Sequence, residues 1–189
     1  MTTLRGKLVL LRAIALDDID EGWLEWINSP TVNNTLASSR PVTRDDLIAY
    51  YRASQPPSAH MFAICELNTG RYVGNGRISS VDADNKKATY GWFIGRPSDR
   101  RSGYGTDALD LLVRFAFDHL RLNRVSTSVR VDNVASLKAN ERVGFKREGI
   151  LREYVLKNGR YYDAVQLSLL RREYELMRAP DGAEIANPN

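Results

Sequence analysis

The sequence is poor in the two residue types that most often hold metals or form disulfides. It contains one cysteine, Cys65, and two histidines, His60 and His119. A single cysteine excludes an internal disulfide and a cluster of cysteine ligands. The histidines have no spacing typical of a metal site, so we expect no metal. Cys65 lies in an apolar stretch that indicates a buried strand, and we expect it to pack in the core rather than to act as a nucleophile.

Long apolar runs and concentrated charge are also lacking. No apolar stretch approaches the length of a membrane span, and residues 1–7 contain no apolar secretory segment, so we expect a soluble, cytoplasmic protein. The formal net charge is +4, a mild basic excess that a polyanionic cofactor would explain. No run of lysine and arginine and no aromatic RNA-binding signature is present. We therefore expect neither nucleic acid nor a membrane as a partner.

The sequence does contain enough apolar residues for one substantial core. Its 189 residues are 43% hydrophobic, which suits a single domain. We place this domain at 1–178 and expect the polar residues 179–189, with their prolines and glycine, to form a disordered tail. Alternating apolar residues and turn signals predict strands at 7–12, 60–67, 72–80, 88–94, 125–131, 145–156 and 161–170.

Helices are predicted from 3.6-residue periodicity and from capping residues. Asp17 or Asp18, Thr43 and Asn133 are placed to cap three of them. The predicted helices are 17–27, 43–53, 104–120 and 133–142. The resulting α+β order predicts a central, mostly antiparallel mixed sheet with helices on both faces.

Residues 88–106 form the segment around which the chain is organised. A strand at 88–94 leads into a basic loop at 96–102, and an amphipathic helix begins near Tyr104. The first N–H groups of a helix lack intrahelical partners, and the helix dipole favours negative charge there. Gly103 and Gly105 let the backbone approach a phosphate closely. Because Arg100 and Arg101 add positive charge, this loop predicts a pyrophosphate site.

Two enzyme families have such a site. Gly103-x-Gly105-x-x-Ala108 fits the dinucleotide fingerprint, with Asp132 at roughly the distance of a ribose-binding acid. In that fingerprint the first glycine directly follows the strand, whereas residues 95–102 intervene here. The downstream sequence also predicts hairpins rather than further strand–helix units. A dinucleotide-dependent oxidoreductase is therefore the weaker interpretation.

Three motifs instead resemble the GNAT acetyltransferase superfamily. Arg100-x-x-Gly103-x-Gly105 resembles the family's acetyl-CoA loop, R/Q-x-x-G-x-G/A. Residues 133–149 resemble its N-x-x-[AS]…K/R-x-G-F…G segment. Residues 158–163, with Glu173-Tyr174 downstream, are similar to the closing hairpin of one branch. That branch holds the ribosomal-protein N-terminal acetyltransferases and many small-amine acetyltransferases. The resemblance covers residues 8–174.

The resemblance implies a fold, a co-substrate and a reaction. In the GNAT fold the strands at 88–94 and 125–131 splay apart, and the pantetheine of acetyl-CoA lies in the gap. The implied reaction is direct attack of a primary amine on the acetyl thioester within a ternary complex, with a backbone N–H near Phe93 or Ile94 as the oxyanion donor. The resemblance leaves a homodimer open. The implied cofactor contacts are Phe93, Ile94, Arg100, Arg101, Ser102, Gly103, Tyr104, Gly105, Thr106, Asn133 and Ser136.

The acid and base usual in the family are missing. Asn140 stands where many members have a tyrosine acid, and Thr89 stands where many have a glutamate on the central strand. Ser136 is our candidate partner for the leaving thiolate, although serine also commonly bonds free N–H groups at a helix start. Glu153 is the first candidate base and Asp163 the second, and water is the alternative to both. Because Asn140 and Thr89 replace the usual acid and base, a second hypothesis is a CoA-binding sensor that has lost catalysis.

The amine acceptor is expected to lie beneath the first two helices. The stretch 23–33 looks similar to acetyltransferases that modify amino sugars of surface polysaccharides. We rank a small amine or amino sugar ahead of a ribosomal-protein N-terminus as the acceptor. For the residues of the first two helices, the alternative is packing for the tryptophans and solvation for the polar side chains. The candidate acceptor contacts are Trp23, Trp26, Asn28, Asn33, Asn34, Arg40, Thr89 and Asp163.

Overall fold

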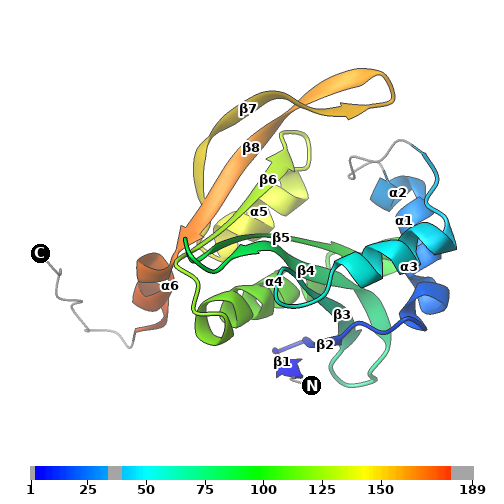
Figure 1. The fold of residues 1–189 in the computed structure, drawn as a ribbon, viewed down its shortest axis with the longest axis horizontal. Helices are drawn as coiled ribbons and strands as arrows, with labels where there is room; N and C mark the ends of the chain where they lie inside the picture. The colour runs from blue at the N-terminus through cyan, green and yellow to red at the C-terminus, as the bar shows by residue number, and fades with distance from the viewer. Residues whose placement is uncertain (1–2, 34–39, 180–189) are drawn as a thin grey trace, which may run out of the picture.

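The structure, a computed structural model, describes residues 3–33 and 40–179. These residues form an eight-stranded sheet in the order β1-β2-β3-β4-β5-β6-β8-β7 (Figure 1). Within it β5 and β6 are parallel, and the other neighbouring strands are antiparallel. The strands are β1 (Leu4–Arg5), β2 (Val9–Ala13), β3 (His60–Glu66), β4 (Tyr72–Asp82), β5 (Lys87–Ile94), β6 (Arg124–Arg130), β7 (Lys146–Lys157) and β8 (Arg160–Leu170).

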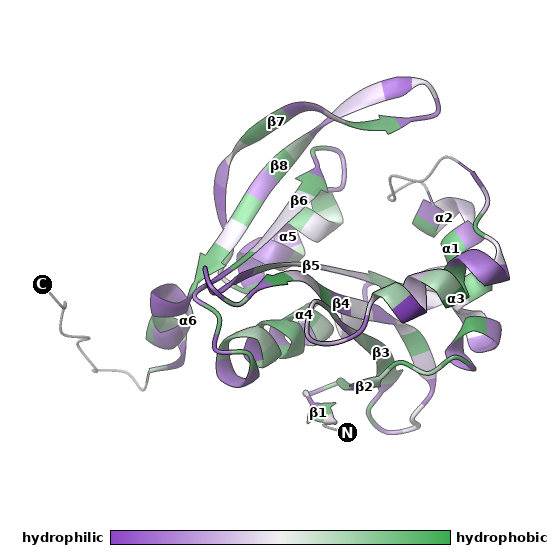
Figure 2. Cartoon of the chain, in the orientation of Figure 1, coloured by the Kyte–Doolittle hydropathy of each residue, from purple (hydrophilic) through white to green (hydrophobic). Residues whose placement is uncertain are grey.

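Helices cover both faces of this sheet, which confirms the predicted architecture. Apolar residues follow the central strands and the sheet-facing side of α4 (Figure 2). One buried cluster packs α4 and α5 on the sheet and includes Leu112 and Leu137. A second cluster packs the first helices on the other face and includes Trp23 and Cys65. The helices and helical turns are η1 (Ile19–Trp23), α1 (Leu24–Asn28), α2 (Pro30–Asn33), α3 (Arg44–Ala53), η2 (Pro97–Asp99), α4 (Tyr104–Arg114), η3 (Phe115–His119), α5 (Val134–Arg142) and α6 (Arg171–Arg178).

Two of the three predicted caps are confirmed. The Thr43 side chain accepts from the Asp46 N–H, and the Asp46 carboxylate accepts from the Thr43 N–H, which completes a capping box. Asn133 caps α5 by accepting from the Ser136 N–H at 3.2 Å. The predicted cap at Asp18 is wrong: its buried carboxylate accepts from Arg12 and from the Ala15 N–H instead. The first helix is divided into η1 and α1, with non-helical backbone at Gly22, and α2 follows from Pro30.

The sheet divides between β5 and β6, as the resemblance implied. These two strands pair only over 87–89 and 124–126. Beyond Thr89, β5 continues along β4, whereas β6 continues along β8. The two halves of the sheet therefore separate from residue 90 onward and leave strand edges facing each other across a gap.

A carboxylate in the first turn of α4 holds the beginning of the described chain. Asp107 accepts from the consecutive N–H groups of Lys7, Leu8 and Val9, at 3.1, 2.8 and 2.9 Å. Gly6 lets the two segments approach, because a Cβ there would lie 2.4 Å from the Asp107 carboxylate. In the described part of the chain, none of the helices combines the length and apolarity that crossing a bilayer requires.

Glu148 on β7 gives the fold a pH-dependent element. Its carboxylate accepts from Arg124 and from the Ser168 hydroxyl, and chiefly the Arg124 guanidinium lowers the pKa of Glu148 from its ordinary value to about 2. A lowered pKa stabilises the fold above the unfolded-state value and loses that effect as the pH falls toward 2. We expect Glu148→Gln to lower the free energy of unfolding at pH 7 by about 0.2–1 kcal/mol, because the pair is part-exposed. Urea midpoints should converge as the pH falls from about 5 toward 2; a constant difference would contradict this account.

Candidate active site

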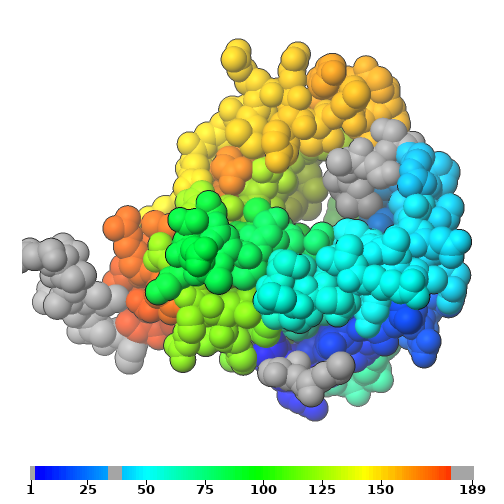
Figure 3. All heavy atoms as spheres, viewed as in Figure 1, coloured from blue at the N-terminus to red at the C-terminus, as the bar shows by residue number. Residues whose placement is uncertain are grey.

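A cavity of about 580 Å³ lies where the two halves of the sheet separate. Residues of β4, β5 and β6 form its base, with η1 and α3 on one side and α5 on the other. In the space-filling view the surface is hollowed between the β6–β8 part and α3 (Figure 3). The residues that line it include Tyr50, Arg77, Tyr90, Phe93, Asn133, Ser136 and Asn140.

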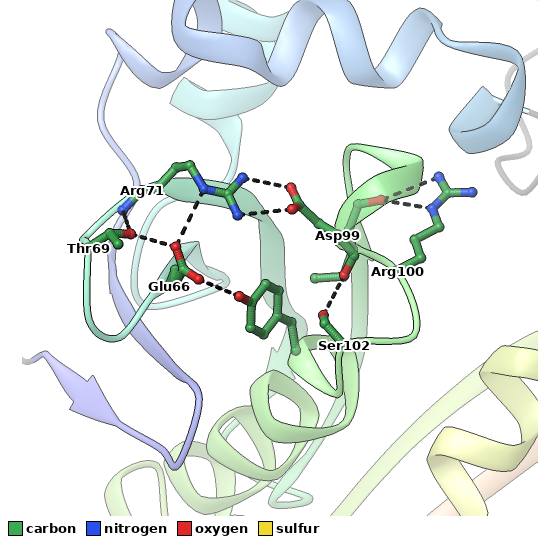
Figure 4. Close-up of polar contacts among 8 residues, drawn as sticks. Glu66, Thr69, Arg71, Asp99, Arg100 and Ser102 are labelled. Atoms are coloured by element: carbon green, nitrogen blue, oxygen red, sulfur yellow. Dashed lines mark hydrogen bonds and ion pairs between the residues drawn. The ribbon is translucent and has the colours of Figure 1, made fainter.

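The basic loop between β5 and α4 is fixed by a network of ion pairs (Figure 4). Arg71 donates both terminal nitrogens to the buried Asp99 carboxylate, at 2.8 and 2.9 Å. The same guanidinium lies 3.5 Å from the Glu66 carboxylate, which accepts from the Tyr104 hydroxyl. Ser102 then closes the turn by donating to the Asp99 carbonyl at 2.6 Å. The β3–β4 hairpin thereby sets the position at which α4 begins.

The start of α4 has the geometry of an anion site. The first intrahelical bond runs from the Asp107 N–H to the Gly103 carbonyl, so the helix leaves the N–H groups of residues 104–106 without an intrahelical acceptor. Gly103 has a φ of +90°, which favours glycine. A Cβ on Gly105 would lie 2.4 Å from the Trp92 ring, so only glycine lets the helix start approach β5 this closely. These features fit the diphosphate of acetyl-CoA.

The two arginines of the loop, Arg100 and Arg101, have different surroundings. Arg100 donates to the carbonyls of Ile94 and Gly95, at 3.3–3.4 Å, so its charge lies at the end of β5. Arg101 is exposed beside the helix start, with a φ of +64°. A second cavity of about 830 Å³ borders the same helix start and includes Gly103 and Thr106.

We expect the Arg71–Asp99 pair to control affinity for acetyl-CoA through the loop it fixes. Arg71→Met should raise the KM for acetyl-CoA about tenfold, because the loop must then be ordered on binding. It should also lower the melting temperature, since it leaves the Asp99 carboxylate buried without its partner. Adding Asp99→Asn should restore stability but not affinity. Arg44→Met, which removes the exposed pair with Asp20, is the control; an unchanged KM for Arg71→Met would contradict the expectation.

The direction of the backbone selects one of the two predicted oxyanion donors. The Gly95 N–H donates to the Val73 carbonyl at the beginning of β4. N–H directions alternate along a strand, and Phe93 pairs with Asn75 on β4 in the same register. The Phe93 N–H therefore points toward β4, whereas the Ile94 N–H points away from β4, toward the gap. Ile94 is the better placed donor.

Asn140 belongs to a buried network that the sequence did not reveal. The Tyr90 hydroxyl donates to the Asn140 side-chain oxygen, and burial raises the pKa of Tyr90 well above its ordinary value, so the phenol stays neutral. The Asn140 amide donates to the Ser136 carbonyl at 2.7 Å and to the Ser136 hydroxyl oxygen at 3.4 Å. Because the Ser136 oxygen accepts from Asn140, its own hydrogen is left to point elsewhere. All three residues line the cavity.

The two candidate bases do not line the cavity. Glu153 is exposed, with a φ of +51°, where the pairing of β7 with β8 is interrupted between Leu151 and Val155. Asp163 accepts from the Glu153 N–H at 2.8 Å and so holds this irregular segment in place. The structure brings the two residues together, but at the hairpin rather than beside Ser136.

The predicted acceptor contacts are distributed between the cavity and its surroundings. Trp23 lines the cavity, whereas Trp26 packs against Tyr72, with ring centroids 4.7 Å apart. Asn28 is bonded to the backbone of Leu24 and Val42 and does not line the cavity. Both tryptophans are buried in the same cluster, so composition alone could not separate them.

Among the described residues, the remaining predicted contacts do not line the cavity. Asn33 accepts from Lys157 at 2.6 Å, which connects α2 to the β7–β8 hairpin. Thr89 lies exposed beside Ser79, to whose carbonyl it donates at 3.2 Å. Arg40 forms an ion pair with the cavity-lining Asp46. Asn34 lies outside the described residues, as does the predicted tail apart from Ala179.

Comparison with known proteins assigns this arrangement to a family. Residues 9–146 match the acetyltransferase (GNAT) domain. The protein p20 of Bacillus licheniformis, named an uncharacterized N-acetyltransferase, is 29% identical over 177 residues, which cover 92% of this chain and 99% of p20. YdaF of Bacillus subtilis (strain 168), named as a candidate ribosomal N-acetyltransferase, is 37% identical over 109 residues, 58% of this chain and 59% of YdaF.

A solved structure shows the same fold. The spermidine N-acetyltransferase from Vibrio cholerae, in complex with CoA and spermine, superposes with a TM-score of 0.82 over 89% of this chain and 98% of its own, at 20% sequence identity. At that identity the likeness concerns the fold alone. Together with the domain match, the divided sheet and the glycine-bearing helix start, it leads to one conclusion. The chain belongs to the GNAT acetyltransferases and is an acyltransferase that uses acetyl-CoA as its co-substrate for N-acetylation.

Proposed function

We propose that the acceptor is the primary amine of a small molecule, either a simple amine or an amino sugar. The observation that supports this is the apolar lining of the acceptor half of the cavity. Aromatic and apolar residues of η1, α1 and α3 line it, among them Trp23, Ile27 and Leu47. Lys157 joins the β7–β8 hairpin to Asn33 of α2. The volume of about 580 Å³ lies within the range of about 300–1,000 Å³ usual for small-molecule sites.

The cofactor contacts in this proposal are those predicted from the motifs. The N–H groups of residues 104–106, with Arg100, Arg101, Ser102 and the two glycines, hold the diphosphate. Backbone of Phe93 and Ile94 borders the pantetheine arm, and Asn133 and Ser136 border its thiol end. The divided sheet supports this placement, because the β5 edge beyond Thr89 has no partner strand within the described residues. Acetyl-CoA supplies the activated acetyl group.

The side chains of this enzyme then have three tasks. The amine must lose its proton, because an alkylamine is mostly protonated near pH 7. Asp46 is a poor base, since its ion pair with Arg40 lowers the pKa of the carboxyl. We assign this proton to water in the open cavity. As the amine nitrogen bonds to the acetyl carbon, the Ile94 N–H stabilises the charge on the carbonyl oxygen. The C–S bond then breaks, and the Ser136 hydroxyl donates to the thiolate.

The names of two relatives favour different acceptor classes. The Vibrio cholerae structure contains spermine, a small amine, whereas YdaF is named for a ribosomal substrate. We place the chain in the branch that includes both kinds of enzyme, with its catalytic unit at residues 1–178. A protein N-terminus is the second acceptor class, and the name of YdaF supports it.

The test is acetyl-CoA consumption, followed by thiol release, across a panel of amines. The panel holds polyamines, aminoglycosides, amino sugars, nucleotide-linked amino sugars and short peptides with free N-termini. Turnover of an amine or amino sugar above that of the peptides is the expected result. Turnover of peptides alone would favour the ribosomal class. Tight CoA binding with no turnover on any amine would overturn the proposal in favour of a sensor.

A further inference from the structure

An arginine on the acceptor side of the cavity has an unusual set of contacts. Arg77 lies on β4 and lines the cavity beside Tyr50. Its guanidinium carbon lies 4.7 Å from the centre of the Tyr50 ring, and one terminal nitrogen donates to the Tyr50 hydroxyl at 2.6 Å. Its Nε is buried and has no hydrogen-bond partner within the described residues. A buried donor without an acceptor is costly, so this group is prepared for a partner that binds there.

Two other partly buried arginines are neutralised by acids, and Arg77 is not. Arg12 is paired with Asp18, and Arg71 with Asp99. Among residues 3–33 and 40–179, no carboxylate lies within 4.0 Å of the Arg77 guanidinium. The sequence of residues 34–39 contains no aspartate or glutamate. Among the residues that the structure describes, no neighbouring acid therefore balances the charge of Arg77.

Arg77 determines the sign of the charge on the acceptor side of the cavity. The described residues that line the cavity include one carboxylate, Asp46, which is bonded to Arg40. The lining also includes Arg130, whose guanidinium is bonded to Asp132. With both of these charges paired, Arg77 gives the acceptor side a positive character. A polyamine, which carries only positive charge, is poorly matched to this wall.

Open space for a ligand group lies over Gly91, the residue that pairs with Arg77 on the neighbouring strand. Gly91 on β5 pairs with Arg77 in the antiparallel register. A Cβ added at Gly91 would meet no atom within 4 Å, so the surface over Gly91 is open. Gly91 precedes the proposed oxyanion donor Ile94 by three residues, which is about 10 Å along a strand. An acceptor therefore reaches both places if its amine and a second group are separated by about nine bonds of an extended chain.

We propose that the acceptor carries an anionic group, a carboxylate or a phosphate, in addition to its amine, and that Arg77 binds this group. The guanidinium presents a planar set of donors that matches both anions, and the Tyr50 ring and hydroxyl hold it in place. The open surface at Gly91 receives the anion. This inference rests on the proposed function and narrows its acceptor class from amines in general to amines with an acidic group.

The first experiment compares matched pairs of acceptors. ω-Amino acids of increasing chain length are assayed beside their amides, and amino sugars beside their phosphates, so that carboxylate and phosphate are read separately. At least tenfold higher kcat/KM for the anionic member of one kind of pair is the expected result. Arg77→Met should remove that preference by raising the KM of the anionic acceptor about tenfold to a hundredfold. The KM for acetyl-CoA should stay unchanged, and Arg77→Lys should recover part of the loss.

Two further measurements separate this inference from the proposed function. Glycerol phosphate and 3-hydroxypropionate lack an amine, so their binding is followed by the NMR signal of the Arg77 Nε–H, assigned with Arg77→Lys. A shift of that signal in an enzyme silent on every amine would sink the proposed function and leave the anion site standing. Equal use of both members of every pair, with no shift of the signal, would overturn the anion site alone. Gly91→Leu, which fills the open surface, should block the shift while acetyl-CoA still binds.

Discussion

Replacing Gly103 with valine is expected to abolish binding of acetyl-CoA at concentrations that saturate the unmodified enzyme. Gly103 has a φ of +90° at the start of α4. A β-branched residue is disfavoured there by about 1–3 kcal/mol, and its Cβ would lie 2.9 Å from the Leu8 side chain. The helix start must shift, and the N–H groups of residues 104–106 lose their common direction. Calorimetric titration with CoA should show an affinity reduced by about a hundredfold or more.

The control separates backbone strain from loss of the anion site. Gly159 has a φ of +75° in the β7–β8 turn, and a Cβ there would meet nothing within 4 Å. Gly159→Val carries similar strain far from the helix start and should bind CoA normally. Gly103→Asn, which tolerates a positive φ better, should recover part of the affinity. Normal CoA binding by a folded Gly103→Val variant would refute the assignment of this loop.

Ser136→Ala is the second change with a large expected effect, on the chemical step. Removing the hydroxyl that donates to the thiolate should lower kcat about a hundredfold, the lower end of what a positioned proton donor contributes. The KM for acetyl-CoA should change little, because the Asn133 cap is retained. Asn140→Leu should reproduce most of the loss, since the Asn140 amide holds the Ser136 oxygen. Stopped-flow detection of thiol release measures the step directly.

A neighbouring serine provides the matched control. Ser128 also lines the cavity, but its hydroxyl donates to the Gln166 side chain at 2.7 Å. Ser128→Ala should leave kcat within about twofold, since surface or non-reacting polar groups rarely change rates more. Equal losses for the two alanine variants would show that Ser136 has no special part in proton transfer. A pH profile of kcat that keeps its shape in Ser136→Ala would also argue against a part for Ser136 in proton transfer.

Features governed by neighbours in sequence could be predicted from the sequence. Thr43 and Asp46 are three residues apart, and their capping box is a local geometry. Asn133 and Ser136 cap α5 for the same reason. The alternation of apolar residues gave the strands of the hairpins to within a residue or two at each end. The glycine pair at 103 and 105, next to a strand and a helix, marked the anion site because the motif itself encodes the turn.

Features made by distant residues could not be predicted in the same way. Tyr90 and Asn140 meet across 50 positions, and neither residue type alone indicates a hydrogen-bonded network. The irregular pairing of β7 with β8 turns Glu153 toward solvent, and a bulge of this kind leaves no regular signal in the sequence. The unpaired charge of Arg77 depends on which acids fail to reach it, which only the assembled cavity determines.

The contact of Asp107 with residues 7–9 has a consequence for the order in which the chain is made. The ribosome completes Lys7, Leu8 and Val9 about a hundred residues before it adds their acceptor. At about 5–20 residues per second, those three amides wait for roughly 5–20 s before their carboxylate exists. Throughout that interval the connection between β1 and β2 lacks its final acceptor. Asp107 follows Gly105 by two residues. The ribosome therefore adds the acceptor for the amides of residues 7–9 at nearly the same time as it completes the cofactor loop.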